Sequence, residues 1–268
     1  TGGFRYDNYE DFGSEWSPKV GAMFKVAEGH RMRMSFGHGF RAPRFGELYL
    51  DLGPFFKGNP DLQPVISDSF TTGYTFYNER VQASIDYFYT KLDNQVAFDF
   101  SGFPFSPITY TNIEGKSTNK GFNTEVAVNL PHGFTPSIAY TYTTRKDSDG
   151  DDIGGFPPPH AATLKFLWAY PPWGLRMNLR GNINGEEKDT GDTFTPGYQI
   201  WYLQASKQFV QWGDQPIRFY AQIDNLFNKK DIFRRSTETG DPIPGELQIW
   251  NADRTFLAGV TIDMEWFR

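Results

Sequence analysis

Residues Ser35–Thr72 read SFGHGFRAPRFGELYLDLGPFFKGNPDLQPVISDSFTT, and the other predictions about the chain start from this segment. Its first part alternates as a strand does and ends at Pro43, which has no N–H to donate and disfavours helical geometry at Ala42. A long irregular loop follows and closes at Pro60 and Pro64, because two prolines so close together suit a rigid turn and exclude a central strand. The segment predicts two strands joined by a long loop, and an ordinary hairpin loop would satisfy the same pattern.

The dominant period along the whole chain is two. Met32, Met34 and Phe36 alternate with polar residues, and stretches such as 138–143 and 255–266 repeat the pattern. Alternation of this kind predicts half-buried β-strands. No window keeps a period of 3.6 residues, so no helix of any length is predicted.

Composition excludes several classes of protein. The chain has 268 residues, enough for one large β domain or two small domains, and it has no cysteine and thus no disulfide framework. Its net charge of −6 argues against a nucleic-acid partner held through phosphates. No apolar run approaches the ~20 residues of a membrane helix. A membrane β-barrel is compatible with this composition, since only alternate residues of each strand face lipid.

The pattern predicts about twelve strands. They cover residues 1–9, 17–27, 30–40, 66–78, 80–98, 116–130, 134–147, 160–170, 173–188, 197–212, 215–228 and 252–268. The links alternate between tight turns, such as 28–29 and 78–79, and long loops, such as 41–65 and 99–115. Such alternation is typical of outer-membrane barrels, which have short periplasmic turns and longer extracellular loops.

The predicted fold class is therefore all-β, a transmembrane antiparallel β-barrel with a polar interior and an apolar exterior. A soluble sandwich with one polar face in water is the alternative. Predicted strands such as 80–98 exceed the ~3–10 residues that are usual in globular proteins, whereas ~9–11 residues suffice to cross a membrane. In the barrel, both ends of this sequence would lie on the periplasmic side, and the end of strand 30–40 would point out of the cell.

Five short motifs follow one another along nearly the whole chain. They are the paired starts Gly3–Asp7 and Ser17–Gly21; Phe40, Arg41, Ala42 and Pro43 with Asn59, Pro60, Asp61 and Leu62; Asn112–Val128 with Gly121 and Glu125; Asp224, Asn225, Leu226 and Phe227; and Arg254–Phe256. In this order they resemble the second half of the barrel of TonB-dependent outer-membrane receptors. Two departures are an interval one residue longer between Gly121 and Glu125, and an Arg268 after the aromatic Phe267.

The resemblance implies a location in the outer membrane of a Gram-negative (diderm) bacterium, in contact with outer-membrane lipid. Receptors of this family have about 22 strands, a plug domain and a TonB-binding segment, so residues 1–268 resemble the C-terminal part of the barrel, with neither plug nor TonB box. The remaining N-terminal strands and the plug would be a separate chain, be cleaved, or lie outside this sequence. A free-standing barrel of twelve strands is the geometric alternative.

The same resemblance implies uptake of a scarce small solute and no catalysis, with energy from the inner-membrane TonB complex acting through the plug. A ferric siderophore is the expected solute, and cobalamin or another chelate is the alternative within the family. Outside it, a passive channel or an adhesin without a plug could use the same barrel.

The predicted outer loops are rich in aromatic and arginine residues. The candidate ligand-binding residues are Arg44, Phe55, Phe56, Phe103, Phe105, Arg234 and Arg235. Flat rings and guanidinium groups suit an aromatic, anionic iron chelate through stacking and charge. An aromatic girdle at the membrane interface, or packing of loop on loop, would explain the rings equally well.

No set of residues indicates an enzyme. None of the four histidines has the spacing of a metal ligand, and the absence of a histidine between Arg44 and Gly58 counts against haem, although His38 lies just before the motif. Carboxylates predicted to face the barrel interior are assigned as wall groups, and contact with a plug domain in the lumen is the alternative. They are Asp86, Asp224, Asp263 and Glu265, with Arg176, Arg180 and Arg218 as their partners.

One acidic loop is a candidate metal site. Asp147, Asp149 and Asp151 alternate around a glycine turn and could give oxygen ligands to Ca²⁺. The loop lacks the sixth-position glycine and the distal glutamate of an EF-hand, so a solvated acidic loop is the alternative. Calcium occurs in extracellular loops of cobalamin receptors of the same family, and no other cofactor is expected.

Overall fold

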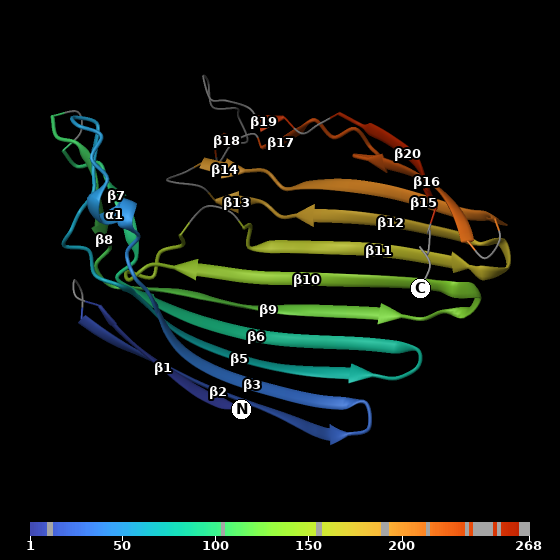
Figure 1. Ribbon diagram of the computed structural model, residues 1–268, viewed down its shortest axis with the longest axis horizontal. Coiled ribbons are helices and arrows are strands. Elements are labelled where there is room, and N and C mark those ends of the chain that lie inside the picture. The colour runs from blue at the N-terminus through green and yellow to red at the C-terminus, as the bar shows by residue number, and fades with distance from the viewer. Residues whose placement is uncertain are drawn as a thin grey trace. The chain divides into compact units, whose positions relative to one another are not determined.

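A computed structural model describes residues 1–9, 13–102, 105–153, 157–188, 193–212, 215–233, 236–237, 249–250 and 253–262. Its main element is a twelve-stranded sheet with the order β1-β2-β3-β5-β6-β9-β10-β11-β12-β15-β16-β20 (Figure 1). The strands are β1 (Gly2–Tyr9), β2 (Gly13–Ala27), β3 (His30–Arg41), β5 (Val65–Tyr77), β6 (Val81–Asp93), β9 (Lys116–Val128), β10 (Phe134–Lys146), β11 (His160–Tyr170), β12 (Leu175–Asn184), β15 (Tyr198–Trp212), β16 (Gln215–Asp224) and β20 (Thr255–Ile262).

Twelve strands in the predicted order are confirmed, and residues 252 and 263–268 of the last predicted strand lie outside the described residues. Each strand pairs with the next sheet strand along the chain, as in an up-and-down barrel wall. β1 and β20 stand at the two ends of that order. In the same described part of the chain, no helix is long and apolar enough to cross a membrane.

The chain divides into two compact units, which we describe separately. The first unit comprises Thr1–Tyr74, Asp86–Gly121 and Thr144–Ile153. The second unit comprises Thr75–Ile85, Phe122–Thr143 and Gly154–Arg268.

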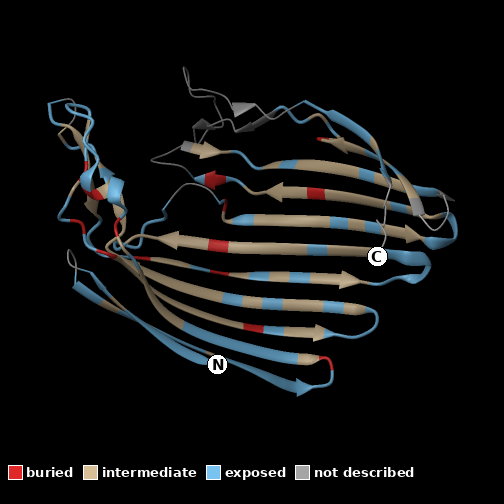
Figure 2. Ribbon diagram, viewed as in Figure 1, coloured by how far each residue is buried: buried red, intermediate tan, exposed pale blue. Residues whose placement is uncertain are grey.

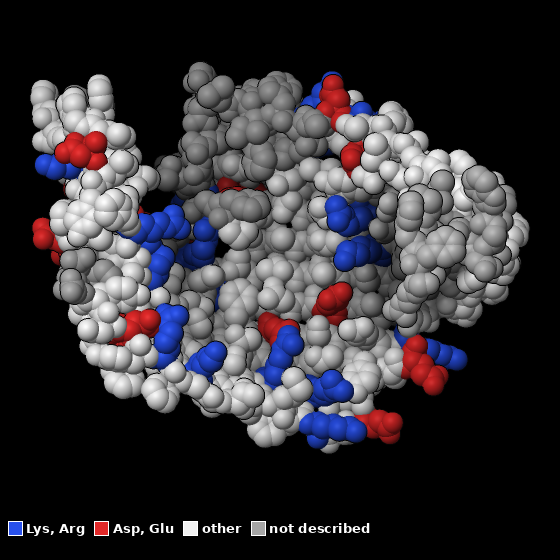
Figure 3. Space-filling model, in the orientation of Figure 1, with Lys and Arg blue, Asp and Glu red and all other residues white. Residues whose placement is uncertain are grey.

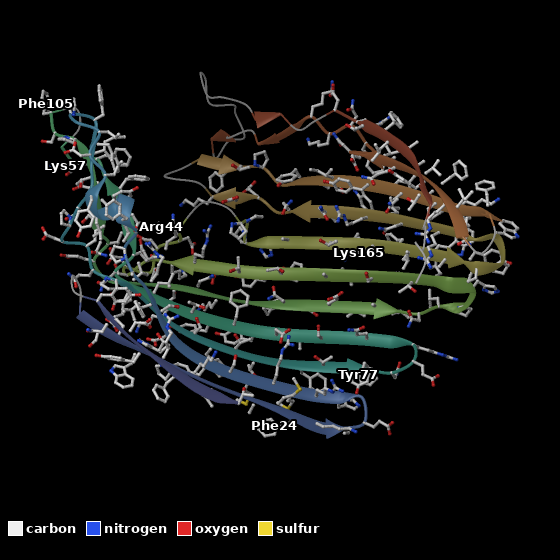
Figure 4. All side chains as sticks on the ribbon, viewed as in Figure 1. Phe24, Arg44, Lys57, Tyr77, Phe105 and Lys165 are labelled. Carbon is white, nitrogen blue, oxygen red and sulfur yellow. The ribbon has the colours of Figure 1, made fainter. Side chains whose placement is uncertain are left out.

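In the first unit, strand register gathers apolar side chains on one face. Tyr6 on β1 lies opposite Trp16 on β2, and Phe24 on β2 (labelled in Figure 4) lies opposite Met32 on β3. Alternate residues of a strand point to the same face, and Trp16 and Phe24 are an even number of residues apart, so both pairs lie on one face. These large side chains are exposed, with 56% of Trp16 open to its surroundings. Burying one large apolar side chain is worth about 1.5–3 kcal/mol. A face of this kind therefore requires lipid in place of water.

The second unit repeats the arrangement on β10, β11, β12, β15, β16 and β20. Phe166 pairs with Leu179 on one face, and the next pair along, Lys165 with Arg180, lies on the other (Figure 4 labels Lys165). Figure 3 shows charged side chains of both signs on the face of the molecule that it displays. Within the described residues, the only buried hydrophobic side chains are Leu48 and Leu62, and buried segments are few in Figure 2. The strands are thus apolar outside and polar inside, without a globular core.

The long links contain structure that the sequence did not predict. Helix α1 (Phe45–Tyr49) contradicts the expectation of no helix, because five residues are too few to produce a period of 3.6. Two 3₁₀ turns, η1 (Pro131–Gly133) and η2 (Pro171–Trp173), occupy short links. Further short strands are β4 (Phe56–Lys57), β7 (Val96–Asp99), β8 (Ile108–Asn112), β13 (Glu187–Lys188), β14 (Thr193–Thr195), β17 (Asp231–Phe233), β18 (Ser236–Thr237) and β19 (Ile249–Trp250).

Predicted strand 80–98 was too long. β6 ends at Asp93, and Asn94 has a positive φ of 55°, which asparagine tolerates better than most residues. The chain turns there before β7 begins. Similarly, predicted strand 173–188 separates into β12 and β13.

For Asp86 and Asp224, the predicted arginine partners were wrong. Asp86 on β6 accepts hydrogen bonds from Arg33 on β3, with Arg33 Nε 2.8 Å from Asp86 Oδ1. Asp224 accepts one from the Gln222 amide at 2.8 Å. Arg180 lies over the ring of Tyr202 with 4.6 Å between guanidinium carbon and ring centroid. The predicted partners Asp263 and Glu265 lie outside the described residues.

Candidate functional site

The loop after β3 is folded by its own motif. Arg41 at the end of β3 donates to Glu47 at 2.9 Å, and the backbone N–H of Arg44 donates to the same carboxylate at 2.7 Å. Burial acts to raise the pKa of Glu47, but the Arg44 N–H and the Arg41 guanidinium outweigh it and lower this pKa below its ordinary value. Glu47 therefore stabilises the first turn of α1 as a carboxylate.

The second half of the motif packs against that helix. A Cβ on Gly58 would lie 2.6 Å from the carbonyl carbon of Leu48, so only glycine allows this close approach. The Asn59 N–H donates to the Glu47 carbonyl at 2.9 Å. Leu62 is only 2% exposed. The motif residues thus fold residues 42–64, which we call the first loop, onto itself.

A second loop, residues 94–115, packs against the first. Its strands β7 and β8 form a three-stranded sheet with β4 of the first loop, and β4 and β8 run parallel. The Asn59 amide donates to the Tyr110 carbonyl at 2.8 Å. Both loops belong to the first unit and extend from the same end of its strands (Figure 1).

Four aromatic rings meet on this small sheet and form what we call the aromatic cluster. The ring centroids of Phe98 and Tyr110 are 4.9 Å apart and stacked, and Phe56 meets the Tyr110 ring edge-on at 5.1 Å. Phe100 lies 6.0 Å from Phe98. Phe98 is 53% exposed, so the cluster leaves ring surface open to a ligand. The geometry suits stacking with a further flat ring.

The predicted ligand residues fall into two groups. Phe56 belongs to the aromatic cluster, whereas Phe55 and Phe105 are exposed at the loop surface, with Phe105 96% exposed (Figure 4 labels Phe105). Arg44 is exposed and extends from the base of α1 (Figure 4). Phe103, Arg234 and Arg235 lie outside the described residues.

Sequence reasoning counted Phe98, Phe100 and Tyr110 among the aromatic residues of the outer loops but did not place them in the candidate site. The available signal was the alternating pattern of residues 96–99 and 108–112, which could have indicated the hairpin that pairs Phe98 with Tyr110. It also left out Phe45, which is exposed on α1 with its ring 5.1 Å from that of Tyr49.

A cavity of about 460 Å³ lies at the base of the two loops in the first unit. Arg41, Ser67 and Gln95 line it with polar groups, and Phe40 and Leu92 are among its apolar residues. The Arg41 guanidinium is paired with Glu47, and Gln95 accepts a hydrogen bond from Ser117 at 2.7 Å. Arg41 and Gln95 are therefore already engaged by other groups of the first unit.

The acidic loop 147–153 uses its first carboxylate for its own turn. Asp147 Oδ1 accepts from the backbone N–H groups of Asp149 and Asp151, at 3.0 and 2.9 Å. Lys146 pairs with Asp152 at 3.4 Å. Within the described residues, no group of three or more histidine or acidic side chains is arranged to hold a metal ion. Calcium binding by this loop stays a prediction.

His38 Nδ1 lies 2.6 Å from Asp68 Oδ1, which joins the end of β3 to the start of β5. The Asp224–Phe227 motif is also engaged in the wall. Asn225, 3% exposed with φ of 52°, binds the backbone of Lys229 through both ends of its amide, at 2.8 and 2.9 Å.

Long loops on a wall of amphipathic strands are typical of an outer-membrane β-barrel. The family model described as TonB dependent receptor-like, beta-barrel matches residues 1–226. The chain belongs to the TonB-dependent receptor family. Members of this family are receptors and transporters of the Gram-negative outer membrane and not enzymes, and this chain is an outer-membrane protein.

Individual relatives agree with the family. The vitamin B12 transporter BtuB of Vibrio vulnificus (strain CMCP6) is 23% identical over 239 residues, which cover 86% of this chain and 36% of BtuB. A mutant of the ferric enterobactin receptor PfeA from Pseudomonas aeruginosa, in complex with enterobactin, superposes with a TM-score of 0.78 at 18% identity, covering 97% of this chain and 42% of PfeA. The siderophore receptor PirA from Acinetobacter baumannii superposes with a TM-score of 0.72 at 16% identity, and the match covers 97% of this chain and 42% of PirA. The chain thus spans about two fifths of the length of these proteins.

Proposed function

We propose that residues 1–268 form the C-terminal part of the barrel and several outer loops of a TonB-dependent transporter that takes up a ferric siderophore. In this proposal, the first N-terminal strands and the plug belong to the rest of the receptor. The inner-membrane TonB complex supplies energy through the plug. The chain described here contributes wall, loops and solute-binding surface, and it carries out no chemistry.

The observation that carries the proposal is an aromatic cluster and an exposed arginine on the same two packed loops. Phe98, Phe100 and Tyr110 present ring surface on a small sheet, and Arg44 lies at the base of the neighbouring helix. An iron chelate built from aromatic rings and anionic oxygens can stack on such rings, at about 0.5–1.5 kcal/mol for each ring pair. It can also accept charge-assisted hydrogen bonds from a guanidinium group.

Cobalamin is the second candidate solute. The observation in its favour is the sequence relationship to BtuB, a vitamin B12 transporter. Cobalamin is large and carries little net charge, so its binding should depend on the rings and only weakly on Arg44. The two solutes therefore predict different effects of the same substitution.

The test is a binding titration of the whole receptor, purified from outer membranes, with a ferric tris-catecholate and with cyanocobalamin. We expect micromolar or tighter binding of the ferric chelate. Arg44→Ala and Phe98→Ala should each weaken it roughly tenfold, which corresponds to about 1.4 kcal/mol. Arg80→Ala changes an exposed arginine next to the short turn between β5 and β6, and serves as the matched control with unchanged affinity.

Two results would contradict the siderophore proposal. The first is wild-type affinity for the ferric chelate in both Arg44→Ala and Phe98→Ala. The second is the absence of ferric-chelate binding by the intact receptor. Tight binding of cyanocobalamin that is insensitive to Arg44→Ala would instead support the second candidate.

A further inference from the structure

Two loops that are distant in sequence are assembled as one body in the first unit. Phe56 and Lys57 of the first loop pair in parallel with Ile108 and Thr109 of the second. The N–H of Ile108 donates to the Phe55 carbonyl at 3.1 Å. Phe56 of the aromatic cluster comes from the first loop, and Phe98, Phe100 and Tyr110 come from the second, so the cluster is complete only while the two loops stay together.

A single amide closes the base of this assembly. Asn112 Oδ1 accepts from the Gln63 N–H at 2.8 Å, and Asn112 Nδ2 donates to the carbonyls of Gln63 and Asn94 at 3.0 and 2.8 Å. Gln63 ends the first loop, and Asn94 begins the second. Asn112 thus joins both ends of the second loop to the far end of the first.

Asn59 makes the second joint, closer to the rings. Its Nδ2 donates to the Tyr110 carbonyl at 2.8 Å, while its Oδ1 accepts from the Asp61 N–H at 2.9 Å. Tyr110 is the ring at the centre of the aromatic cluster, in contact with both Phe56 and Phe98. The side chain therefore fixes the backbone that carries this ring.

Both asparagines are engaged on each side of the amide, as donor and as acceptor. Leaving part-buried polar groups of this kind without a partner costs free energy. Removing one partner therefore destabilises the loops by more than the average stabilisation from one hydrogen bond. An aspartate at position 112 would keep the bond to the Gln63 N–H. It would also place a negative charge against two carbonyl oxygens, which repels them.

We propose that Asn112 and Asn59 are positioning residues that lock the first and second loops into a single recognition body before any solute binds. Such a body presents the aromatic cluster already formed, and solute binding does not have to supply the ordering of two loops. The locking stands independently of the proposed function. Only its consequence for affinity rests on that function.

The test measures hydrogen–deuterium exchange of backbone amides in the whole receptor without ligand, in wild type and in Asn112→Ala. We expect exchange to rise roughly tenfold or more in peptides from both loops, because both ends of the assembly lose hydrogen bonds. Asn112→Asp should fail to restore protection. Asn78→Ala is the matched control, since Asn78 Oδ1 also accepts two backbone N–H bonds but at the short turn before β6.

Faster exchange confined to peptides of residues 94–115 would overturn the proposal, since the loops would then open independently. The same exchange profile in Asn112→Ala and wild type would overturn it as well. In Asn78→Ala, only peptides around residues 78–81 should exchange faster.

A second arm adds the ferric chelate to both proteins. We expect it to restore loop protection in Asn112→Ala and to add little in wild type, because the wild-type loops are already ordered. Equal added protection in the two proteins would contradict the positioning role. If the loops open together in the variant while wild type binds no ferric chelate, the locking holds and the proposed function fails.

Discussion

Gly73 on β5 shows how a single missing side chain shapes the barrel wall. Arg33 on β3 and Asp86 on β6 form their ion pair across β5, and a Cβ at position 73 would collide with the Asp86 carboxylate and lie 3.1 Å from Arg33 Nε. The Asp86 side chain is mostly buried, whereas that of Arg33 is about half exposed. Glycine is therefore required by the space that the ion pair fills, and no special backbone conformation is involved.

We expect Gly73→Ala to lower the free energy of unfolding of the receptor by about 1–3 kcal/mol, as overpacking usually does. Gly37→Ala on β3 is the matched control, because a Cβ there meets nothing within 4 Å. Urea unfolding of the purified receptor in detergent micelles measures the difference. In an Asp86→Ala background the effect of Gly73→Ala should largely disappear. An undiminished effect would show that the ion pair is not the cause.

Glu47 makes the stability of the first loop depend on pH. Its pKa is lowered in the folded loop from an ordinary value of 4.5, so its stabilising contribution is fully present above 4.5 and is lost as pH falls through the folded-state pKa. We expect limited proteolysis within residues 42–64 to accelerate below that point. In Glu47→Gln, the rate of this proteolysis should already be high at neutral pH and should change little as the pH falls. An equal response to acid in both proteins would assign the effect to other groups.

At the scale of elements, the strands followed from the sequence and the loop structure did not. A period of two is visible over eight or more residues, so strands such as β3 and β11 could be bounded to within a residue or so. α1 and β4 are too short for any period, and contacts such as Asn59 with Tyr110 hold them in place. Those contacts join residues that are distant in sequence.

The candidate site was predictable only in part for the same reason. The aromatic composition of the loops pointed to Phe56, but the cluster is completed by Phe98 and Tyr110 through the pairing of β7 and β8. The motifs, in contrast, were recognisable in the sequence, but their structural role in folding the loop was not. Arg41, Gly58 and Leu62 fold the loop that presents the site, and their residue types alone could not distinguish this from ligand contact.

The turn after β16 makes a prediction of its own. Asn225→Ala removes both amide bonds to Lys229 and leaves a β-carbon at positive φ, so we expect a loss of about 2–3 kcal/mol in unfolding free energy. Asn225→Gly should be intermediate, because it accepts the backbone conformation but not the bonds. Thermal unfolding followed by circular dichroism would compare them with Asn8→Ala, an exposed asparagine of β1. Equal stability of the alanine and glycine variants would argue against backbone strain.

At the scale of the whole molecule, the alternation of tight turns and long loops fixes the orientation in the membrane. Short links such as Asn78–Arg80 should face the periplasm, and the loops that carry Phe105 should face the medium. The chain has no cysteine, so single ones can report on each side. In intact cells, a maleimide that cannot cross the outer membrane should label Phe105→Cys and not Glu79→Cys, and both after lysis. The reverse labelling pattern would show that the barrel has the opposite orientation in the membrane.

The measurement that tests the central claim most directly is uptake of an iron-loaded siderophore by iron-starved cells that carry the whole receptor. We expect saturable uptake that stops when the receptor or TonB is deleted and when a protonophore dissipates the proton gradient. The purified receptor should also be nearly silent in a planar bilayer. Uptake that continues at an unchanged rate without energy, together with a steady single-channel conductance, would contradict active transport and leave a passive channel as the function of this barrel.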